Sequence, residues 1–262
     1  MVSKPMRTAR EIARYADSLL DSVNTPDYPN AVNGLQLENR GIIEGIAAAV
    51  DYSTRAIEGA ITAKANLLVV HHGMFWGGLG SLVGPAYSRL RLMLDHDVAV
   101  YSSHLPLDRH TALGNNALLA KELELQPQQP FARHEHISIG VAGTCDIETE
   151  VLLQRAHAFA AREGGTARVS HITAGRRTKT WAICTGAGAS ADTLAEAISD
   201  GIDTLIVGEG PHWTAVSAED HGIAIIYAGH YATETLGVRA LAMHLGEKFA
   251  IPWTFIPAPT GL

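Results

Sequence analysis

The sequence predicts an α/β fold built from two related α/β domains, each with a mainly parallel sheet covered by helices. Short apolar strands alternate with helical segments, which is typical of parallel βαβ units. Two stretches, 60–73 and 197–210, share one order: a helix end, a polar link, an apolar strand, a polar pair and a glycine. A second related pair follows at 96–108 and 221–234. We interpret the repeat as an internal duplication; chance similarity between α/β units is the alternative.

The periodicity of apolar residues defines the expected elements in order. An N-terminal helix is expected, with one apolar stripe made of Ile12, Tyr15, Ala16, Leu19 and Leu20. Further helices are expected at 53–65, 87–96, 115–125, 189–201, 214–221 and 233–249. Strands are expected at 45–50, 66–70, 98–103, 137–144, 179–184, 204–207 and 223–228. The Pro- and Gln-containing stretch 126–136 is expected to be a linker, after which the strand at 137–144 opens the second domain.

Composition restricts the classes of partner. The chain has 262 residues, of which 47% are hydrophobic and 18% charged, as in a globular protein. Its net charge of −7 lacks the basic footprint of a nucleic-acid-binding protein, and no apolar run reaches the length of about 18 residues that spans a membrane. Two widely separated cysteines, Cys145 and Cys184, and the lack of an apolar leader core favour a cytoplasmic location.

Paired histidines end one apolar strand. The strand at 67–70 runs into His71 and His72, and Gly73 follows. Successive side chains of a strand point to opposite faces, so both rings cannot serve one packing surface within a strand. A turn at Gly73 would let both rings converge on a ligand beyond the strand's carboxyl end.

Other ligand-type residues occupy equivalent positions. His104 and His230 each follow a strand, and Asp108 and Glu234 come four residues later. Functional groups of parallel sheets collect beyond the carboxyl ends of strands, and this mixture of imidazole and carboxylate suits Zn, Mn, Fe or a similar ion. The set exceeds the needs of one tetrahedral ion, so a two-metal centre with ions roughly 3.5–4 Å apart accounts for it better.

Simpler interpretations of single residues stay open. His230 and Glu234 suit an ordinary solvated pair on a helix, and His104 suits an orienting partner of Asp108 rather than a ligand. Pro106 argues against a continuous helix from His104 to Asp108.

Several residues near the strand ends are weaker candidates. Glu209 and His212 follow the strand at 204–207 and are candidates for the lining of the same cavity. Phe75, Trp76 and Trp213 suit either a stacking wall or the core. The turn "GAGAS" at 186–190 suits phosphate binding or a tight turn, but it lacks the third glycine of a dinucleotide site and the lysine of a P-loop. Histidines and arginines away from strand ends are expected at the surface: Arg109, His110, His134, His136 and His244.

Six motifs together resemble the Nif-three-like family, also called the GTP cyclohydrolase I type 2 homologues, in its short bacterial form. They are "NGLQLEN", "VVHHGMFWGG", "SSHLPLDRHTALGNNALLA", "CTGAGAS", "VGEGPHW" and "AGHYATETLGVRAL", and they span Asn33 to about Leu245 in the expected order.

The resemblance implies a dinuclear centre in the cleft between two domains, and a ring-shaped homohexamer. It implies a first domain from 1–125 plus 230–262 and a second from 126–229. The family's metal ligands fall on His71, His72, Asp108, His230 and Glu234.

The implied activity is metal-dependent hydrolysis of a small-molecule substrate, with GTP as the nucleotide that the family name indicates. His104 and Glu209 are then candidates for proton transfer. The alternative is a metal-binding or partner-binding protein without turnover.

Overall fold

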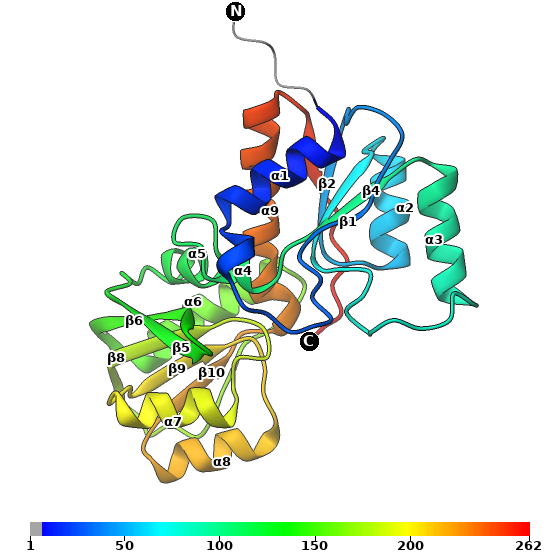
Figure 1. Ribbon diagram of the computed structural model, residues 1–262. Helices are drawn as coiled ribbons and strands as arrows, with labels where there is room; N and C mark the ends of the chain where they lie inside the picture. Colours follow the sequence, from blue (N-terminus) through cyan, green and yellow to red (C-terminus); the bar gives the residue numbers. More distant parts are fainter. Residues whose placement is uncertain (1–6) are drawn as a thin grey trace, which may run out of the picture. The chain divides into compact units, whose positions relative to one another are not determined.

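The computed structural model describes residues 7–262. Residues 1–6, which begin the segment expected to lack an apolar leader core, lie outside the described residues. The chain forms two compact α/β units (Figure 1). Unit 1 comprises Met1–Leu107 and Val238–Ala258, and unit 2 comprises Asp108–Gly237 and Pro259–Leu262. The chain passes between them at the short helix α4 (Leu105–Asp108) and within the long helix α9 (His230–Phe249).

Unit 1 contains a five-stranded sheet in the order β1-β4-β3-β2-β11. Its strands are β1 (Gly34–Leu37), β2 (Ile46–Asp51), β3 (Leu67–His72), β4 (Ala99–Ser102) and β11 (Trp253–Phe255). Four of them are parallel, and only β1 pairs antiparallel, with β4. The carboxyl ends of β2, β3 and β4 therefore meet at one edge of this sheet.

Helices cover both faces of the unit 1 sheet (Figure 1). The helices α2 (Thr54–Thr62) and α3 (Pro85–Asp95) pack with alternate apolar residues of β2, β3 and β4 in one core cluster. On the other face, Tyr101 of β4 donates a hydrogen bond to Asp17 of α1 (Ala9–Leu19) at 2.9 Å. A capping box begins α1, because Thr8 accepts from the Glu11 amide and Glu11 accepts from the Thr8 amide. A 3-10 turn, η1 (Ser22–Asn24), follows α1.

Unit 2 contains a six-stranded sheet in the order β5-β6-β8-β9-β10-β7. Its strands are β5 (Gln129–His134), β6 (Ile137–Glu148), β7 (Arg168–Val169), β8 (Arg177–Cys184), β9 (Thr204–Val207) and β10 (Ala224–Tyr227). Only β8, β9 and β10 are parallel, whereas β5, β6 and β7 pair antiparallel. The prediction of a mainly parallel sheet is therefore wrong for unit 2, whose sheet is mixed.

The unit 2 sheet is also covered on both faces. Trp181 and Ile183 of β8 join the core cluster with α5 (Asn115–Glu122) and α6 (Thr149–Arg162). Ala182 and Cys184 alternate with them and join the cluster with α7 (Ala191–Ser199) and α8 (His212–Asp220). Among the described helices, none is long and apolar enough to cross a membrane.

Both units contain the β-α-β-α-β order that the internal repeat predicts. In unit 1 it runs β2-α2-β3-α3-β4, and in unit 2 it runs β8-α7-β9-α8-β10. The repeat aligns Leu67 with Thr204, and these residues begin the central strands β3 and β9. In each unit the central strand pairs in parallel with both neighbours.

The segment expected to be a linker, 126–136, contains the edge strand β5, so that prediction is wrong. Phe131 of β5 is fully buried, and its backbone is registered opposite Gly140 of β6. Pro130 concealed the strand in the sequence, but an edge strand tolerates proline because one of its sides needs no ladder hydrogen bonds. The preceding helix α5 packs on β6 and β8, which places the predicted domain boundary after residue 125 inside unit 2.

We predict that Phe131→Ala lowers the free energy of unfolding by about 3–5 kcal/mol, because it removes a fully buried aromatic side chain. Arg133→Ala is the matched control on the same strand, with an exposed side chain. It should change stability by less than about 0.5 kcal/mol. Denaturant unfolding measures both, and equal small effects would mean that 129–134 does not belong to the folded sheet.

Candidate metal centre

The two histidines predicted at the end of the first apolar strand are the last residues of β3, which continues through both. Both side chains are buried, and their ring centroids lie 4.9 Å apart. Gly73 follows at a place where a Cβ would overlap the side-chain amide of Gln36. Gln36 also accepts a hydrogen bond from the Met74 amide at 2.6 Å. The chain leaves β3 at Gly73, where any larger side chain would require Gln36 to move and would disturb its contact with Met74.

Neighbouring strands hold one nitrogen of each of these rings. His71 Nδ1 lies 2.9 Å from the carbonyl oxygen of Ser103, which follows β4. His72 Nδ1 lies 2.9 Å from Oδ1 of Asp51, the last residue of β2. The parallel register places Asp51 opposite His72 and Val70 opposite Ser102, so both partners arrive from adjacent strand ends.

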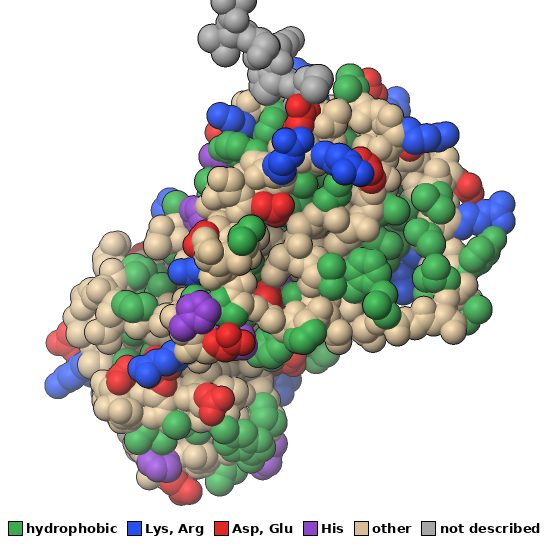
Figure 2. Space-filling view, viewed as in Figure 1, with side chains coloured by type: hydrophobic (Ala, Val, Ile, Leu, Met, Phe, Trp, Pro, Cys, Tyr) green, Lys and Arg blue, Asp and Glu red, His purple; other side chains and the backbone are tan. Residues whose placement is uncertain are grey.

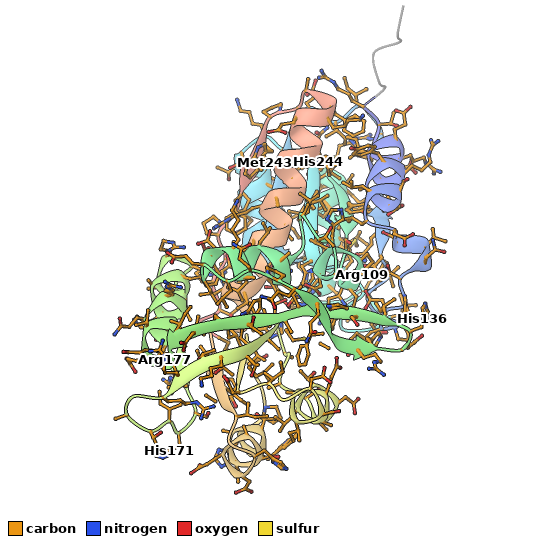
Figure 3. The ribbon with its side chains drawn as sticks, turned by 90° about the vertical axis from the view of Figure 1, so that its left-hand side faces the viewer. Arg109, His136, His171, Arg177, Met243 and His244 are labelled. Carbon is orange, nitrogen blue, oxygen red and sulfur yellow. The ribbon has the colours of Figure 1, made fainter. Side chains whose placement is uncertain are left out.

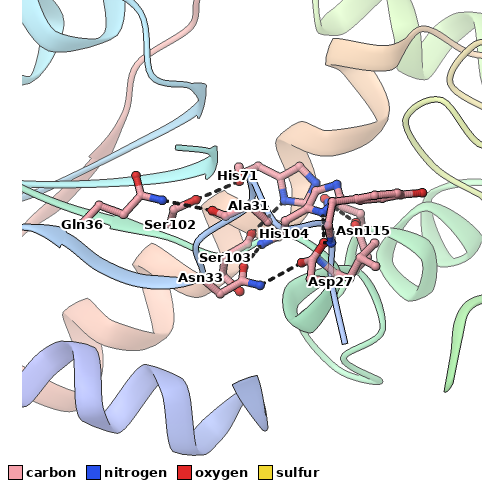
Figure 4. Close-up of polar contacts among 12 residues, drawn as sticks. Asp27, Ala31, Asn33, Gln36, His71, Ser102, Ser103, His104 and Asn115 are labelled. Atoms are coloured by element: carbon pink, nitrogen blue, oxygen red, sulfur yellow. Dashed lines mark hydrogen bonds and ion pairs between the residues drawn. The ribbon is translucent and has the colours of Figure 1, made fainter. Parts of the chain in front are cut away.

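His104 joins the same group from the end of β4. Its Nδ1 lies 2.7 Å from Oδ1 of Asp27, and its backbone amide donates to Oδ1 of Asn33 at 2.7 Å. Asp27 also accepts from Asn33 at 2.8 Å and from the Leu105 amide at 2.9 Å (Figure 4). Burial raises the pKa of Asp27, but the hydrogen bond and charge of His104, with the two other donors, outweigh burial and hold that pKa below its ordinary value.

These contacts determine the tautomer of each ring in its neutral form. A neutral imidazole has one N–H donor and one lone-pair acceptor. Nδ1 of His71, His72 and His104 each faces an oxygen, so in the neutral form of each ring Nδ1 carries the proton and Nε2 carries the lone pair. Carboxylate or carbonyl support of this kind is typical of histidines that bind metals.

The three imidazoles fit a divalent metal ion. His71, His72 and His104 each offer a ligand atom, and these atoms lie within 4.8 Å of one another. All three residues are buried, which excludes an ordinary solvated surface group. Three imidazoles with fixed orientation suit Zn and other transition ions. The structure thus places His104, predicted as a proton-transfer residue, among ligand-type imidazoles.

Unit 2 holds a second group, around the start of α9. His230 Nε2 lies 3.1 Å from Oε2 of Glu234, one turn further along the helix. His230 Nδ1 lies 2.6 Å from Oε1 of Glu209, which follows β9. Glu209, predicted as a proton-transfer residue, therefore supports His230 in the way that Asp51 supports His72.

The two carboxylates change the protonation of His230. Burial lowers the pKa of His230, but the hydrogen bonds and charges of Glu234 and Glu209 outweigh burial and raise the pKa to about 9. The metal-free protein therefore carries a proton on each ring nitrogen of His230 at neutral pH. A metal ion bound at Nε2 would replace one of these protons.

Asp108, the remaining predicted ligand, ends α4 and is buried within unit 2. Its Oδ1 accepts a hydrogen bond from Asn115 Nδ2 at 2.8 Å. The side-chain oxygen of Asn115 accepts from the Gly237 amide of α9 at 2.7 Å. Asn115 therefore ties the Asp108 carboxylate to the helix that carries His230 and Glu234.

Trp76 lies against the imidazoles of unit 1. Its ring centroid is 4.6 Å from that of His72 and 4.5 Å from that of His104. Tyr28 meets it edge-on, with the centroids 6.5 Å apart. Since 37% of Trp76 stays exposed, it offers a flat apolar surface beside the histidines.

The "GAGAS" turn packs against Glu234, and two of its amides bond within unit 2. The amide of Gly186 donates to Oγ1 of Thr233, and that of Ala189 donates to the carbonyl of Glu209. Gly186 has a φ of +63°, and a Cβ there would overlap the Glu234 carboxylate. The turn therefore acts as packing for the ligand-type residues of α9.

Other candidate residues lie on the surface of their elements. His212 and Trp213 are exposed at the start of α8. Figure 3 shows His136 at the tip of the β5–β6 hairpin and His244 on α9. Among the residues expected at the surface, His136 is exposed, whereas Arg109, His110, His134 and His244 are half-buried. His244 Nε2 lies 2.7 Å from the hydroxyl of Tyr15.

Sequence reasoning missed the residues that orient the imidazoles. Asp51 had a signal, because it is a carboxylate at the carboxyl end of a predicted parallel strand. Asn33 opens the motif "NGLQLEN", but nothing in the sequence linked it to His104. Asp27 had no signal, because it lies in an irregular segment far from His104 in the sequence.

We predict that Gly186→Ala displaces Glu234 and lowers the pKa of His230 from about 9 toward its ordinary value. Removing one carboxylate neighbour reduces stabilisation of the protonated ring. Gly175→Ala is the matched control, since Gly175 also has positive φ, at +76°, but open space around it. NMR titration of the metal-free protein measures the pKa. A His230 pKa that moves equally in both variants, or in neither, would contradict the role of Gly186.

Comparisons with known proteins agree with this geometry. The profile of the family described as DUF34/NIF3 (NGG1p interacting factor 3) matches residues 7–260. A relative from Deinococcus radiodurans named GTP cyclohydrolase 1 type 2 homolog is 40% identical over 90% of this chain and 88% of its own. One of the same name from Pyrococcus abyssi is 38% identical over 96% and 98%.

Solved structures show the same fold. The protein ybgI, described as of unknown function, superposes with a TM-score of 0.87 at 31% identity, covering 97% of this chain and all of that one. TTHA1606 from Thermus thermophilus gives a TM-score of 0.81 at 30% identity, with the same coverage. The chain belongs to the DUF34/NIF3 family, whose curated relatives are named GTP cyclohydrolase 1 type 2 homologs.

Proposed function

We propose that this protein binds two divalent metal ions and hydrolyses a small-molecule substrate with them. The observation that carries the proposal is the buried group His71, His72 and His104, in which every Nδ1 faces a protein oxygen. Such support orients each ring as in histidines that bind a metal ion through Nε2.

The proposed ligands come from both units: His71, His72, Asp108, His230 and Glu234. The proposal requires the ligand groups of the two units to face each other across a cleft. Two ions would explain why the set contains more donors than one ion needs. Zn, Mn and Fe are all compatible with this mixture of imidazole and carboxylate.

The chain's own residues would orient the reaction. Two bound divalent ions supply an activated water and stabilise developing negative charge. Asp51 and the Ser103 carbonyl hold the rings of His72 and His71, while Glu209 holds His230. Asp27 fixes the orientation of the His104 ring. The lone pair on Nε2 of the neutral ring would then accept a proton or complete the ligand set.

A nucleotide such as GTP is the proposed substrate class. The names of the curated relatives support it, and the exposed face of Trp76 suits a purine ring. The family resemblance further supports a ring-shaped homohexamer, which the molar mass in solution tests.

We expect about two metal ions per chain in the purified, metal-loaded protein. His71→Ala and Glu234→Ala should each lower that content, because each removes a ligand from a different unit. His136→Ala, at the exposed hairpin tip, is the control and should leave the content unchanged. Elemental analysis measures the ratio; if both ligand variants retain the full metal content, the proposed centre is wrong.

Turnover separates a hydrolase from a binding protein. We expect metal-loaded wild-type protein to hydrolyse GTP or another nucleotide. Asp108→Asn should abolish turnover while the fold persists, because a neutral amide is a poorer ligand for a hard divalent ion. Trp76→Ala should weaken nucleotide affinity, whereas the control Trp213→Ala should not. If wild type turns over no nucleotide and Trp76→Ala leaves affinity unchanged, a metal-containing partner-binding protein becomes the better account.

A further inference from the structure

Unit 1 contains a cavity of about 390 Å³ beside the histidine group. Its walls come from the ends of β2 and β3, from the loop after Gly73 and from α3. Asp51 and His72 line the cavity together with Tyr52, Trp76 and Arg89. A cavity of this volume accommodates a small organic ligand.

Arg89 of α3 supplies the positive charge of this cavity. Its guanidinium carbon lies 5.6 Å from the centre of the Tyr52 ring. Its Nε is buried and has no hydrogen-bond partner among the residues that the structure describes. Buried donors are nearly always hydrogen-bonded, so the unsatisfied Nε of a residue that lines the cavity indicates that the Arg89 guanidinium meets its partner only when a ligand is bound. By contrast, Arg91 on the same helix pairs with Asp95 at 3.2 Å.

The remaining lining favours an organic anion over a metal ion or a cation. Among the lining residues, Asp51 is the one carboxylate, and its Oδ1 accepts from His72. The rest of the wall is mostly apolar or glycine, including Met74, Phe75 and Leu90. Figure 2 shows hydrophobic side chains gathered on the same part of unit 1, near α3. The Arg89 guanidinium would pair with one anionic oxygen group of a ligand, and the apolar lining would contact the ligand's apolar part.

We propose that this cavity binds an organic anion, with its phosphate or carboxylate group at Arg89 and its flat apolar part against Trp76. This assignment deepens the proposed function, on which it rests, because a ligand held there would place its body beside His72.

The test uses metal-stripped protein, so that an anion cannot bind through a metal ion. Phenyl phosphate, benzoate and the neutral benzyl alcohol are titrated separately, with calorimetry and tryptophan fluorescence as readouts. We expect phenyl phosphate or benzoate to bind, and whichever binds more tightly identifies the oxyanion. Arg89→Gln should weaken that anion about tenfold or more, because a charge-assisted hydrogen bond is lost. Benzyl alcohol should bind equally to wild type and variant.

Arg91→Gln is the matched control, because it removes the same charge from the same helix outside the cavity. Arg91→Gln should leave anion affinity within about twofold of wild type, because dissolved salt screens the interaction between this exposed charge and the bound anion. Equal weakening in both glutamine variants would overturn the proposal, as would wild-type protein that binds neither anion. Arg89→Lys keeps the charge but loses the planar fork, so we expect intermediate affinity, and wild-type affinity there would also contradict the assignment.

Failure here stays distinct from failure of the proposed function. Arg89→Gln should retain the wild-type metal content, because Arg89 is not a ligand. Protein with full metal content and no anion site would refute this inference alone. Protein that binds the anion without holding metal would refute the proposed centre alone.

Discussion

Four imidazole rings in this protein have their Nδ1 atoms held by oxygens: His71 by the Ser103 carbonyl, His72 by Asp51, His104 by Asp27 and His230 by Glu209. These contacts fix both the tautomer and the direction of each ring. Without them, the three buried imidazoles of unit 1 would leave polar atoms without partners, at a free-energy cost of about 1–3 kcal/mol each. The local packing of both units therefore depends on satisfying these nitrogens.

Parallel strand register is what delivers the partners. In unit 1, β2, β3 and β4 end at one sheet edge, so Asp51 and Ser103 arrive beside the β3 histidines without a long loop. In unit 2, β9 supplies Glu209 and the segment after β10 begins α9 with His230. The same β-α-β-α-β arrangement thus places ligand-type residues at strand ends in each unit, as expected for open parallel sheets.

Glycine occupies two positions where a side chain approaches the backbone closely. Gly73 lies against the Gln36 side chain just beyond β3, and Gly186 leaves room for the Glu234 carboxylate at positive φ. Both glycines sit next to ligand-type residues. The loop after Gly73 then forms a wall of the cavity that Arg89 lines, so the chain that leaves the histidine group also builds the neighbouring site.

The sequence by itself determined the family, the alternation of strands and helices, the internal repeat and the residue types that suit a metal. Periodicity and strand-end placement involve residues close together in the sequence, so the sequence alone shows them. Tertiary structure alone decided that β5 replaces the expected linker, because Phe131 is buried by distant neighbours despite Pro130. It also decided the antiparallel edges of unit 2, which depend on pairing between segments rather than on their composition. Asp27 orients His104 although the two residues lie far apart in sequence. Arg89 likewise lies over Tyr52, and its Nε has no partner among the described residues. No local sequence pattern encodes such contacts.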